Sequence, residues 1–401
     1  MIDEEKGTAY WKQNLWVCVF GSFTTIVAMT LLLPFLPLYV EELGVHDHAA
    51  IVQWSGAAYG ATFLTAAMFA PLWGRLGDQY GRKLMLIRAS LGMAVAMSLI
   101  GLSQNVYQLV GLRLLAGLLG GYSSGSTVLV ATQTPRGQMA WALGVMSSGV
   151  MAGNLAGPLI GGGLPQLIGI RATFLAAGAI IFVAFLATTF LIKEDARPSH
   201  RSAASRHGGW ASIADKRPVV AMLVTGMLLM LANMSIEPII TVYVATIVPD
   251  EARVTIIAGL AMSAAALGSI LSASRLGKLA DRLGHLRVIV GCLLVSAILL
   301  IPQAFVTAGW QLLGLRFLMG LSLGGLLPCV ATVIRHNVPE RSAGTILGYS
   351  TSSQYVGQVV GPLAGGFVGG HIGMRAVFLG TSVLMAVGAA YSWLSQPRRG
   401  G

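Results

Sequence analysis

Charge is scarce in this sequence, and its scarcity excludes most classes of soluble protein. Only 10% of the 401 residues are Asp, Glu, Lys or Arg, whereas 55% are hydrophobic. Soluble domains carry about 25% charged residues. We therefore expect a chain that is solvated mostly by lipid. The 51 glycines fit this expectation, because small residues allow helices to approach closely inside a bilayer.

Cysteine clusters and nucleotide-binding loops are also missing. The three cysteines, Cys18, Cys292 and Cys329, each lie in an apolar run, so they predict neither a disulfide framework nor a metal site. The sequence has no HExxH motif and no phosphate-binding P-loop. We predict no enzyme activity, no metal and no cofactor. Any process that this chain drives would then draw its energy from a source other than ATP bound at such a loop.

Twelve apolar segments are long enough to span a membrane, which takes about 20 residues. The polar, acidic start of the chain predicts that the first segment is retained as a membrane helix and not cleaved as a signal peptide. The predicted spans are 15–40, 52–73, 84–103, 107–131, 139–164, 171–192, 219–247, 254–274, 287–306, 310–334, 342–368 and 375–395.

Lysine and arginine are distributed unevenly between the predicted loops. All but five of the 26 lie at the termini or in loops on one side. The opposite loops hold Arg171, Arg253 and Arg375, and two spans contain Arg113 and Arg316. Because loops rich in Lys and Arg stay in the cytoplasm, both termini are predicted to be cytoplasmic. The net charge of +11 is then a topology signal, and we predict no nucleic-acid binding.

The two halves of the chain repeat each other at an offset of 203 or 204 residues. The matching positions are Gly74 and Asp78 with Gly277 and Asp281, Arg113 with Arg316, Gly157 and Pro158 with Gly361 and Pro362, Arg171 and Phe174 with Arg375 and Phe378, and Pro34 and Tyr39 with Pro238 and Tyr243. We predict an all-α membrane protein of two six-helix bundles related as a parallel repeat. The bundles would comprise residues 1–192 and 219–401, joined by a cytoplasmic linker at 193–218.

The loop between the second and third predicted spans carries a motif of glycine, acid and basic residues. Its residues are Gly74, Asp78, Gly81, Arg82 and Lys83, and the second half repeats it as Gly277, Asp281 and Arg282. This motif resembles the signature loop of the major facilitator superfamily. The resemblance implies a cytoplasmic gate at these residues, and the alternative is that the charges only set topology. Two departures from the family pattern are Gln79 in the first copy and His285, in place of a double basic pair, in the second.

Three charged residues lie deep inside predicted spans, where a charge costs about 2.5 kcal/mol or more. Arg113 resembles the arginine that the family ties to proton coupling, and the alternative is a structural arginine that caps carbonyl groups. For its repeat mate Arg316 we expect a structural role. Glu237 is our candidate protonation site, because burial disfavours a charged carboxylate. The alternative places Glu237 in a water pocket near the end of its span.

The fifth predicted span has glycines at four-residue spacing, which form one smooth helix face. They are Gly149, Gly153, Gly157 and Gly161, and Pro158 favours a bend among them. The run resembles the motif of superfamily exporters that exchange substrate for protons. The alternative is a packing role, since the eleventh span repeats the spacing. The substrate cavity is predicted from polar or aromatic residues within apolar spans, namely Tyr39, Asn154, Asn233, Tyr243, Gln354 and Tyr355.

Residues 33–40, 81–86, 113–121 and 131–135 are similar to the bacterial drug:proton antiporter branch of the superfamily. The resemblance implies a monomer in the inner membrane that exports small amphipathic drugs in exchange for protons. Its partners would be those substrates, protons and membrane lipid. A proton-coupled uptake or metabolite symporter of the same fold is the first alternative, because fold alone does not set direction. A receptor or scaffold that transports nothing is the second.

Overall fold

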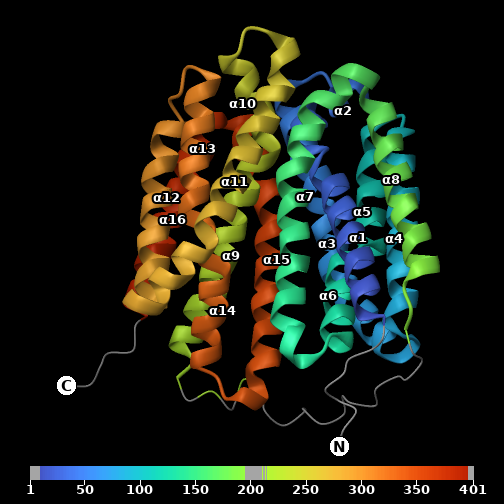
Figure 1. Cartoon of the computed structure of the whole chain (residues 1–401). Helices are drawn as coiled ribbons and strands as arrows, with labels where there is room; N and C mark the ends of the chain where they lie inside the picture. Colours follow the sequence, from blue (N-terminus) through green and yellow to red (C-terminus); the bar gives the residue numbers. More distant parts are fainter. Residues whose placement is uncertain (1–9, 195–209, 211–212, 214, 396–401) are drawn as a thin grey trace, which may run out of the picture. The chain divides into compact units, whose positions relative to one another are not determined.

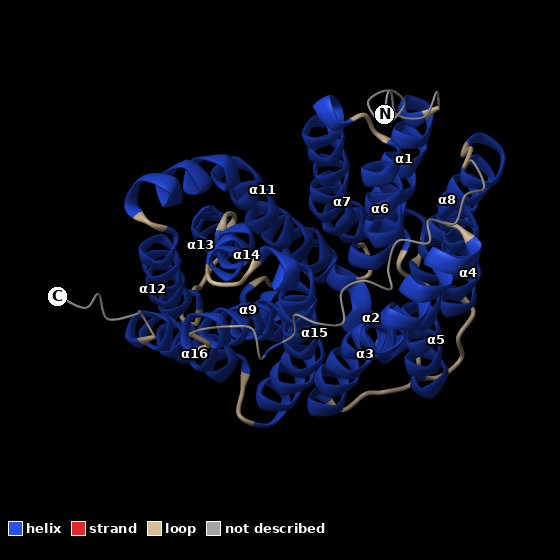
Figure 2. Cartoon of the chain, turned by 90° about the horizontal axis from the view of Figure 1, so that it is seen from below, coloured by secondary structure: helices blue, strands red, loops and turns tan. Residues whose placement is uncertain are grey.

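The structure, a computed structural model, describes residues 10–194, 210, 213 and 215–395. Every long element in these residues is a helix, and no strand occurs among them (Figures 1 and 2). The α-helices are α1 (Trp11–Thr30), α2 (Leu36–Glu42), α3 (His48–Tyr80), α4 (Arg82–Gly101), α5 (Val106–Leu119), α6 (Tyr122–Gln133), α7 (Met139–Ile168), α8 (Ile170–Leu191), α9 (Arg217–Ile236), α10 (Ile240–Ile247), α11 (Glu251–Leu283), α12 (His285–Gln303), α13 (Gly309–Leu323), α14 (Leu326–His336), α15 (Glu340–His371) and α16 (Met374–Leu394). The predicted helical class is confirmed. Most of the predicted linker at 193–218 lies outside the described residues.

Ten segments of the described chain are long and apolar enough to cross a membrane. The other two predicted spans correspond to α3 and α15, which have 33 and 32 residues but are not among those ten. Both helices contain amide side chains within the predicted span, such as Gln53 in α3 and Gln358 in α15. Such side chains lower the mean hydropathy of these two helices.

The chain divides into two compact units. The first comprises Met1–Gly44 and Ala61–Ser199, and the second comprises Val45–Gly60 and His200–Gly401. The first part of α3 thus belongs to the second unit, although α3 is one continuous helix. The bundle boundaries expected from the sequence, 1–192 and 219–401, stay a prediction.

Several membrane spans are interrupted at proline or glycine residues, which disfavour regular helix geometry. A 3-10 turn at Leu33–Phe35 separates α1 from α2, and another at Glu237–Ile239 separates α9 from α10; each contains a proline. Proline lacks the N–H that a helix interior needs. The break between α5 and α6 lies at Gly120 and Gly121, and Gly121 has a φ of 99°, which favours glycine.

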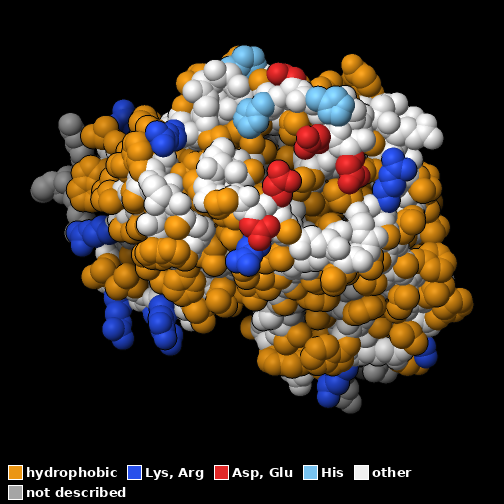
Figure 3. All heavy atoms as spheres, turned by 90° about the horizontal axis from the view of Figure 1, so that it is seen from above, with side chains coloured by type: hydrophobic (Ala, Val, Ile, Leu, Met, Phe, Trp, Pro, Cys, Tyr) orange, Lys and Arg blue, Asp and Glu red, His pale blue; other side chains and the backbone are white. Residues whose placement is uncertain are grey.

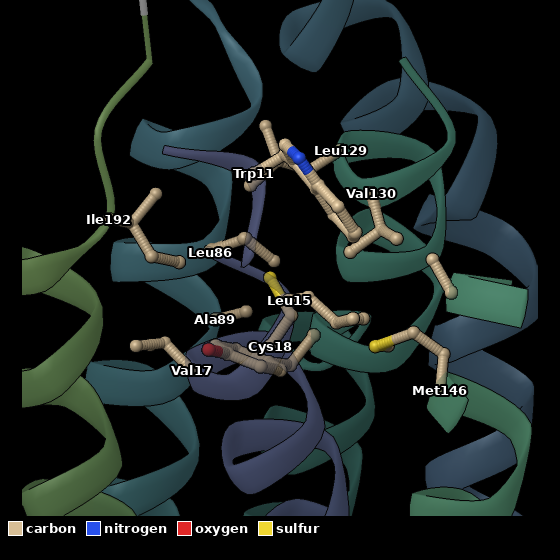
Figure 4. Packing of buried hydrophobic residues seen from close by; sticks show 12 residues of the cluster. Trp11, Leu15, Val17, Cys18, Leu86, Ala89, Leu129, Val130, Met146 and Ile192 are labelled. Carbon is tan, nitrogen blue, oxygen red and sulfur yellow. The ribbon is translucent and has the colours of Figure 1, made fainter. Parts of the chain in front are cut away.

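The core of the first unit is a dry cluster of apolar side chains (Figure 4). Trp11, Leu15 and Cys18 enter it from α1, and they meet Leu86 from α4 and Met146 from α7. Leu15 and Cys18 are 0% exposed. Cys18 therefore acts as a small packing residue, as its apolar sequence context predicts.

Glycine faces bring two pairs of helices into backbone contact, one pair in each unit. In the first unit α7 packs on α1, and a Cβ at Gly149 would lie 2.9 Å from a side-chain carbon of Val19. In the second unit α15 packs on α9, where a Cβ at Gly361 would lie 2.6 Å from the Leu231 carbonyl. Contact this close is how helices associate inside lipid, where water supplies no driving force.

The surface is dominated by apolar side chains. Seen from above, acidic and histidine side chains are exposed among hydrophobic and neutral atoms (Figure 3). The end of α2 contributes exposed Glu41 and Glu42, and the turn that follows contributes exposed His46 and Asp47. Lipid-facing positions such as Phe190 and Val183 remain more than half exposed, which is expected where the solvent is hydrocarbon.

The close contact of α7 with α1 predicts that Gly161→Ala lowers stability. The added Cβ would overlap the Leu31 carbonyl, so the two backbones must separate. We expect a loss of about 1–3 kcal/mol in the free energy of unfolding, measured as a lower Tm in detergent. Gly163→Ala is the control, because its Cβ would meet nothing within 4 Å. Equal Tm values for the two variants would show that the glycine face does not set the helix distance.

Candidate functional sites

The first signature loop joins α3 to α4 through a turn that needs glycine. Gly81 has a φ of 94°, in the left-handed region that L side chains rarely adopt. One turn earlier, Asp78 at the end of α3 forms an ion pair with Arg82, the first residue of α4. Gly74, by contrast, has open space where a Cβ would lie. The loop is therefore held by Gly81, Asp78 and Arg82 more than by Gly74.

Glu194 also contacts this loop, from a position 112 residues later in the chain. Its carboxylate accepts hydrogen bonds from the backbone N–H of Arg82 at 2.9 Å and of Lys83 at 2.7 Å. These donors belong to the first turn of α4, which lacks intrahelical partners for them. The negative charge also interacts favourably with the positive end of the helix dipole. Glu194 thus fixes where α4 begins.

The backbone that carries Glu194 is itself held in place. Asn14 of α1 donates to the Lys193 carbonyl at 2.7 Å and accepts from the Lys193 N–H at 3.0 Å. Asn14 also donates to the Gln133 side chain at 2.6 Å, and Gln133 donates to the Lys193 carbonyl at 3.3 Å. Asn14 is buried, so these polar groups are satisfied by one another and not by water.

The second signature loop joins α11 to α12 with different chemistry. Gly284 has a φ of 95°, as Gly81 does in the first loop. Asp281 faces His285 across 3.5 Å, an ion pair only when the imidazole is protonated. His285 also stacks edge-on against His336, with ring centroids 5.9 Å apart. Gly277 has open space at its Cβ position, and Arg282 is exposed.

Arg113 lies in α5 and is 0% exposed. Side chains of α3 bind the carbonyl groups around it: Thr62 donates to the Arg113 carbonyl at 3.1 Å, and Thr65 donates to the Leu114 carbonyl at 2.7 Å. These bonds attach α3 to the helix that carries the arginine. The burial of Arg113 at membrane depth agrees with either of the roles expected from the sequence.

The end of α5 is held by a second cation, the partly buried Arg88. Arg88 donates to the Leu119 carbonyl at 2.9 Å, and its guanidinium lies 3.6 Å from the ring centroid of Trp73. Trp73 in turn donates to the Leu118 carbonyl at 2.8 Å. These carbonyls have no helical partner, because α5 breaks at Gly120. Arg88 and Trp73 therefore stabilise the interruption of this span.

Glu237 lies at the break between α9 and α10 and is partly buried. Tyr59 of α3 donates a hydrogen bond to its carboxylate at 3.0 Å. The charge of Arg316, on α13, also interacts with it. Arg316 is 2% exposed and Tyr59 is 4% exposed. The structure thus brings together an acid, a phenol and a guanidinium, all within the second unit.

The glycines of the exporter-like motif all face α1. Gly149, Gly153, Gly157 and Gly161 are buried, and each Cβ would press on α1. The repeat in α15 packs on α9 in the same way. This arrangement explains the spacing by packing, and Pro158 lies on the same buried face.

The predicted cavity residues divide into two groups. Tyr39 and Tyr243 lie in the interior of their units, where their hydroxyls donate to the carbonyls of Ile100 at 2.6 Å and Gln303 at 2.7 Å. The second group comprises Asn154, which is exposed on α7, and the partly buried residues Asn233, Gln354 and Tyr355. This second group is better placed to meet a ligand than the two tyrosines.

Sequence reasoning missed Tyr59 and Glu194 as partners of the candidate sites, and it gave Arg316 a structural role only. No local motif marks the first two, because their contacts join segments more than 100 residues apart. Arg316 did carry a signal, since a charge inside an apolar span needs a partner.

Within the part of the chain that the structure describes, no group of three His, Cys, Asp or Glu residues is arranged to hold a metal.

A family model that matches nearly the whole chain identifies the family of this sequence. The model of the Major Facilitator Superfamily matches residues 18–251 and 254–401. The chain belongs to this superfamily. It is 42% identical over 386 residues to multidrug resistance protein MdtG of Proteus mirabilis, covering 96% of each chain. It is 43% identical over 390 residues to MdtG of Salmonella typhimurium, covering 97% of this chain and 96% of that one.

Solved structures confirm the major facilitator fold. A bacterial homolog of the human lysosomal transporter Spinster aligns with a TM-score of 0.77 at 16% identity, covering 97% of both chains. The human organic anion transporter MFSD10 aligns with a TM-score of 0.69 at 17% identity, covering 96% of this chain and 100% of that one. This chain is thus a multi-pass membrane protein of a transporter superfamily, as its sequence motifs predict.

The capping of α4 predicts that Glu194→Ala weakens the first signature loop of this major facilitator. Two backbone donors would lose their acceptor, at a cost of about 1 kcal/mol in the free energy of unfolding. The measurement is the Tm of the purified variant in detergent, with Glu41→Ala as a control at an exposed carboxylate. A Tm for Glu194→Ala equal to that of the control would contradict the capping role.

Proposed function

We propose that this chain exports small amphipathic drug-like molecules from the cytoplasm in exchange for protons. The observation that carries the proposal is its similarity to two multidrug resistance proteins over almost their whole length. The chain would work as a monomer in a bacterial inner membrane, with both termini in the cytoplasm. Alternating access between two six-helix bundles, 1–192 and 219–401, would move the substrate past the midplane.

Glu237 is the proposed protonation site of this exchanger. Its support is physical: a carboxyl at the break of a membrane span is costly unless it has partners or a task. Tyr59 and Arg316 supply groups that stabilise the ionised form, while the apolar surroundings favour the neutral form. A carboxyl subject to both influences changes its protonation state readily when the cavity exposes it to a different side.

The other candidate residues take supporting roles in this proposal. The loops at Asp78 and Arg82 and at Asp281 and Arg282 would form the cytoplasmic gate. Arg113 would support proton coupling from the first bundle. Substrate would contact the second group of cavity residues, namely Asn154, Asn233, Gln354 and Tyr355.

Flux direction separates export from the uptake alternative. Purified protein would be reconstituted into liposomes, and ethidium movement would be followed under an imposed pH gradient. We expect ethidium to move against its own gradient, in the direction opposite to proton flow. Movement of ethidium in the same direction as protons would overturn the exchange proposal, and an absence of any flux would favour a protein that does not transport.

The proposed role of Glu237 predicts that Glu237→Gln abolishes proton-driven ethidium transport in these liposomes. The amide has the shape of the carboxyl but cannot exchange a proton at physiological pH. Exchange of ethidium for ethidium across the membrane should continue, because it needs no proton. Glu41→Gln, at an exposed carboxylate, is the control. Full proton-driven transport by Glu237→Gln would remove this residue from the coupling mechanism.

A further inference from the structure

The first part of α3 packs on the end of α15 through glycines contributed by both helices. A Cβ at Gly60 would lie 3.2 Å from the Val359 carbonyl, and one at Gly366 would lie 3.0 Å from the Val52 carbonyl. A Cβ at Gly56 would overlap the Pro362 carbonyl. We call this contact, between residues 49–60 and 359–370, the glycine seam. At these glycines the backbones of the two helices are in direct contact.

The two helices of the seam, α3 and α15, are the long helices that lie outside the ten apolar spans. Alanine and glycine dominate their facing surfaces, so the seam buries few large side chains. No single side chain therefore adds much stability to this contact. The two helices of the seam can separate and close again if polar contacts at its ends control the movement.

Polar contacts lie near both ends of the seam. At its outer end the Gln53 amide meets the His371 ring at 2.9 Å, where both side chains are accessible to water. Near its inner end Tyr59 donates at 3.0 Å to Glu237, which lies outside the seam in the turn between α9 and α10 that packs on α15, and there the phenol is buried. The buried contact is the stronger of the two, because water does not compete for it.

The strength of the Tyr59 contact depends on the charge of its acceptor. A phenol O–H bound to a carboxylate is a charge-assisted hydrogen bond, roughly twice as strong as a bond between neutral groups. Protonation of Glu237 removes that charge and with it the electrostatic attraction to Arg316. The seam therefore has a hydrogen bond that weakens when Glu237 gains a proton.

An exchanger must not switch between its inward-facing and outward-facing states while it carries neither drug nor proton. If it did, protons could cross without drug export, and the proton gradient would be dissipated. We propose that Tyr59 is a positioning residue that holds the glycine seam closed while Glu237 is ionised and unoccupied. This inference rests on the proposed function of Glu237. A proton releases the seam by neutralising the carboxylate, and a bound cationic drug releases it by competing for the same carboxylate. Only the loaded protein then opens the outer end.

The test measures seam opening directly, without any drug. Val52, which is 0% exposed in the seam, would be replaced by cysteine in a chain whose three native cysteines are alanine. Its rate of labelling by a membrane-impermeant maleimide, added outside cells, would be measured from pH 5.5 to 8. Rates would be divided by those for His46→Cys, an exposed position in the neighbouring turn, to remove the intrinsic pH dependence of thiols.

We expect the Val52→Cys protein to label slowly at pH 8 and faster at pH 5.5. Adding Tyr59→Phe should raise the rate at pH 8 about tenfold and abolish its pH dependence, as expected when a charged hydrogen bond is lost. Tyr122→Phe is the matched control, because the buried Tyr122 hydroxyl bonds a neutral group, the Thr188 hydroxyl, at 2.6 Å. A Tyr59→Phe variant that keeps the normal pH response would overturn the proposal.

A second measurement separates this inference from the proposed function. In liposomes, Tyr59→Phe should still carry ethidium down its gradient, but with fewer protons returned per ethidium than the unchanged protein. If the unchanged protein moves no protons with ethidium, the exchange proposal fails, while the labelling experiment still decides whether Tyr59 holds the seam. An unaltered ratio of protons to ethidium in Tyr59→Phe would contradict the role of the seam in coupling.

Discussion

A bilayer offers no water to polar groups, so every charge and every free backbone group in a membrane span needs a partner in the protein. The structure meets this constraint at the places where its helices break. The Arg88 guanidinium and the Trp73 indole bind carbonyls at the end of α5, and Tyr59 donates a hydrogen bond to the carboxyl of Glu237 at the break after α9. Helix breaks are thus among the positions at which this chain keeps polar groups inside its membrane spans. The proposed transport mechanism depends on one of them.

The two halves of the internal repeat share their helix packing but differ in the charged residues of their signature loops. Both copies of the glycine face press on the first helix of their half, Gly157 near Thr30 of α1 and Gly361 near Leu231 of α9. Backbone contact of this kind tolerates no added side chain, so both halves retain it. The signature loops have diverged, because His285 occupies the repeat position of Arg82. An arginine keeps its charge at any physiological pH, whereas an imidazole does not. The two loops are therefore unequal as electrostatic contacts.

The sequence predicted the parts of the fold that depend on local composition. Runs of apolar residues located the helices, and the motif around Asp78 was enough to indicate the superfamily. Helix ends were less accurate: the span expected at 52–73 is a helix from His48 to Tyr80, because helices continue past the hydrocarbon layer. Contacts between distant segments could not be predicted. Glu194 reaches α4 across 112 residues and Tyr59 reaches Glu237 across 178, and neither carries a motif. Tyr39, expected at a cavity, instead lies buried with its hydroxyl on a backbone carbonyl, which an isolated sequence does not distinguish.

The exchange mechanism depends on one carboxyl, that of Glu237, which must release its proton when a drug binds. Proton release on drug binding tests it most directly. Ethidium would be added to the purified protein in weakly buffered detergent solution near neutral pH, and the change in pH would be recorded together with ethidium binding. The account predicts that binding releases protons from the unchanged protein and releases none from Glu237→Gln, although that variant still binds ethidium. Equal proton release from both proteins would contradict the account.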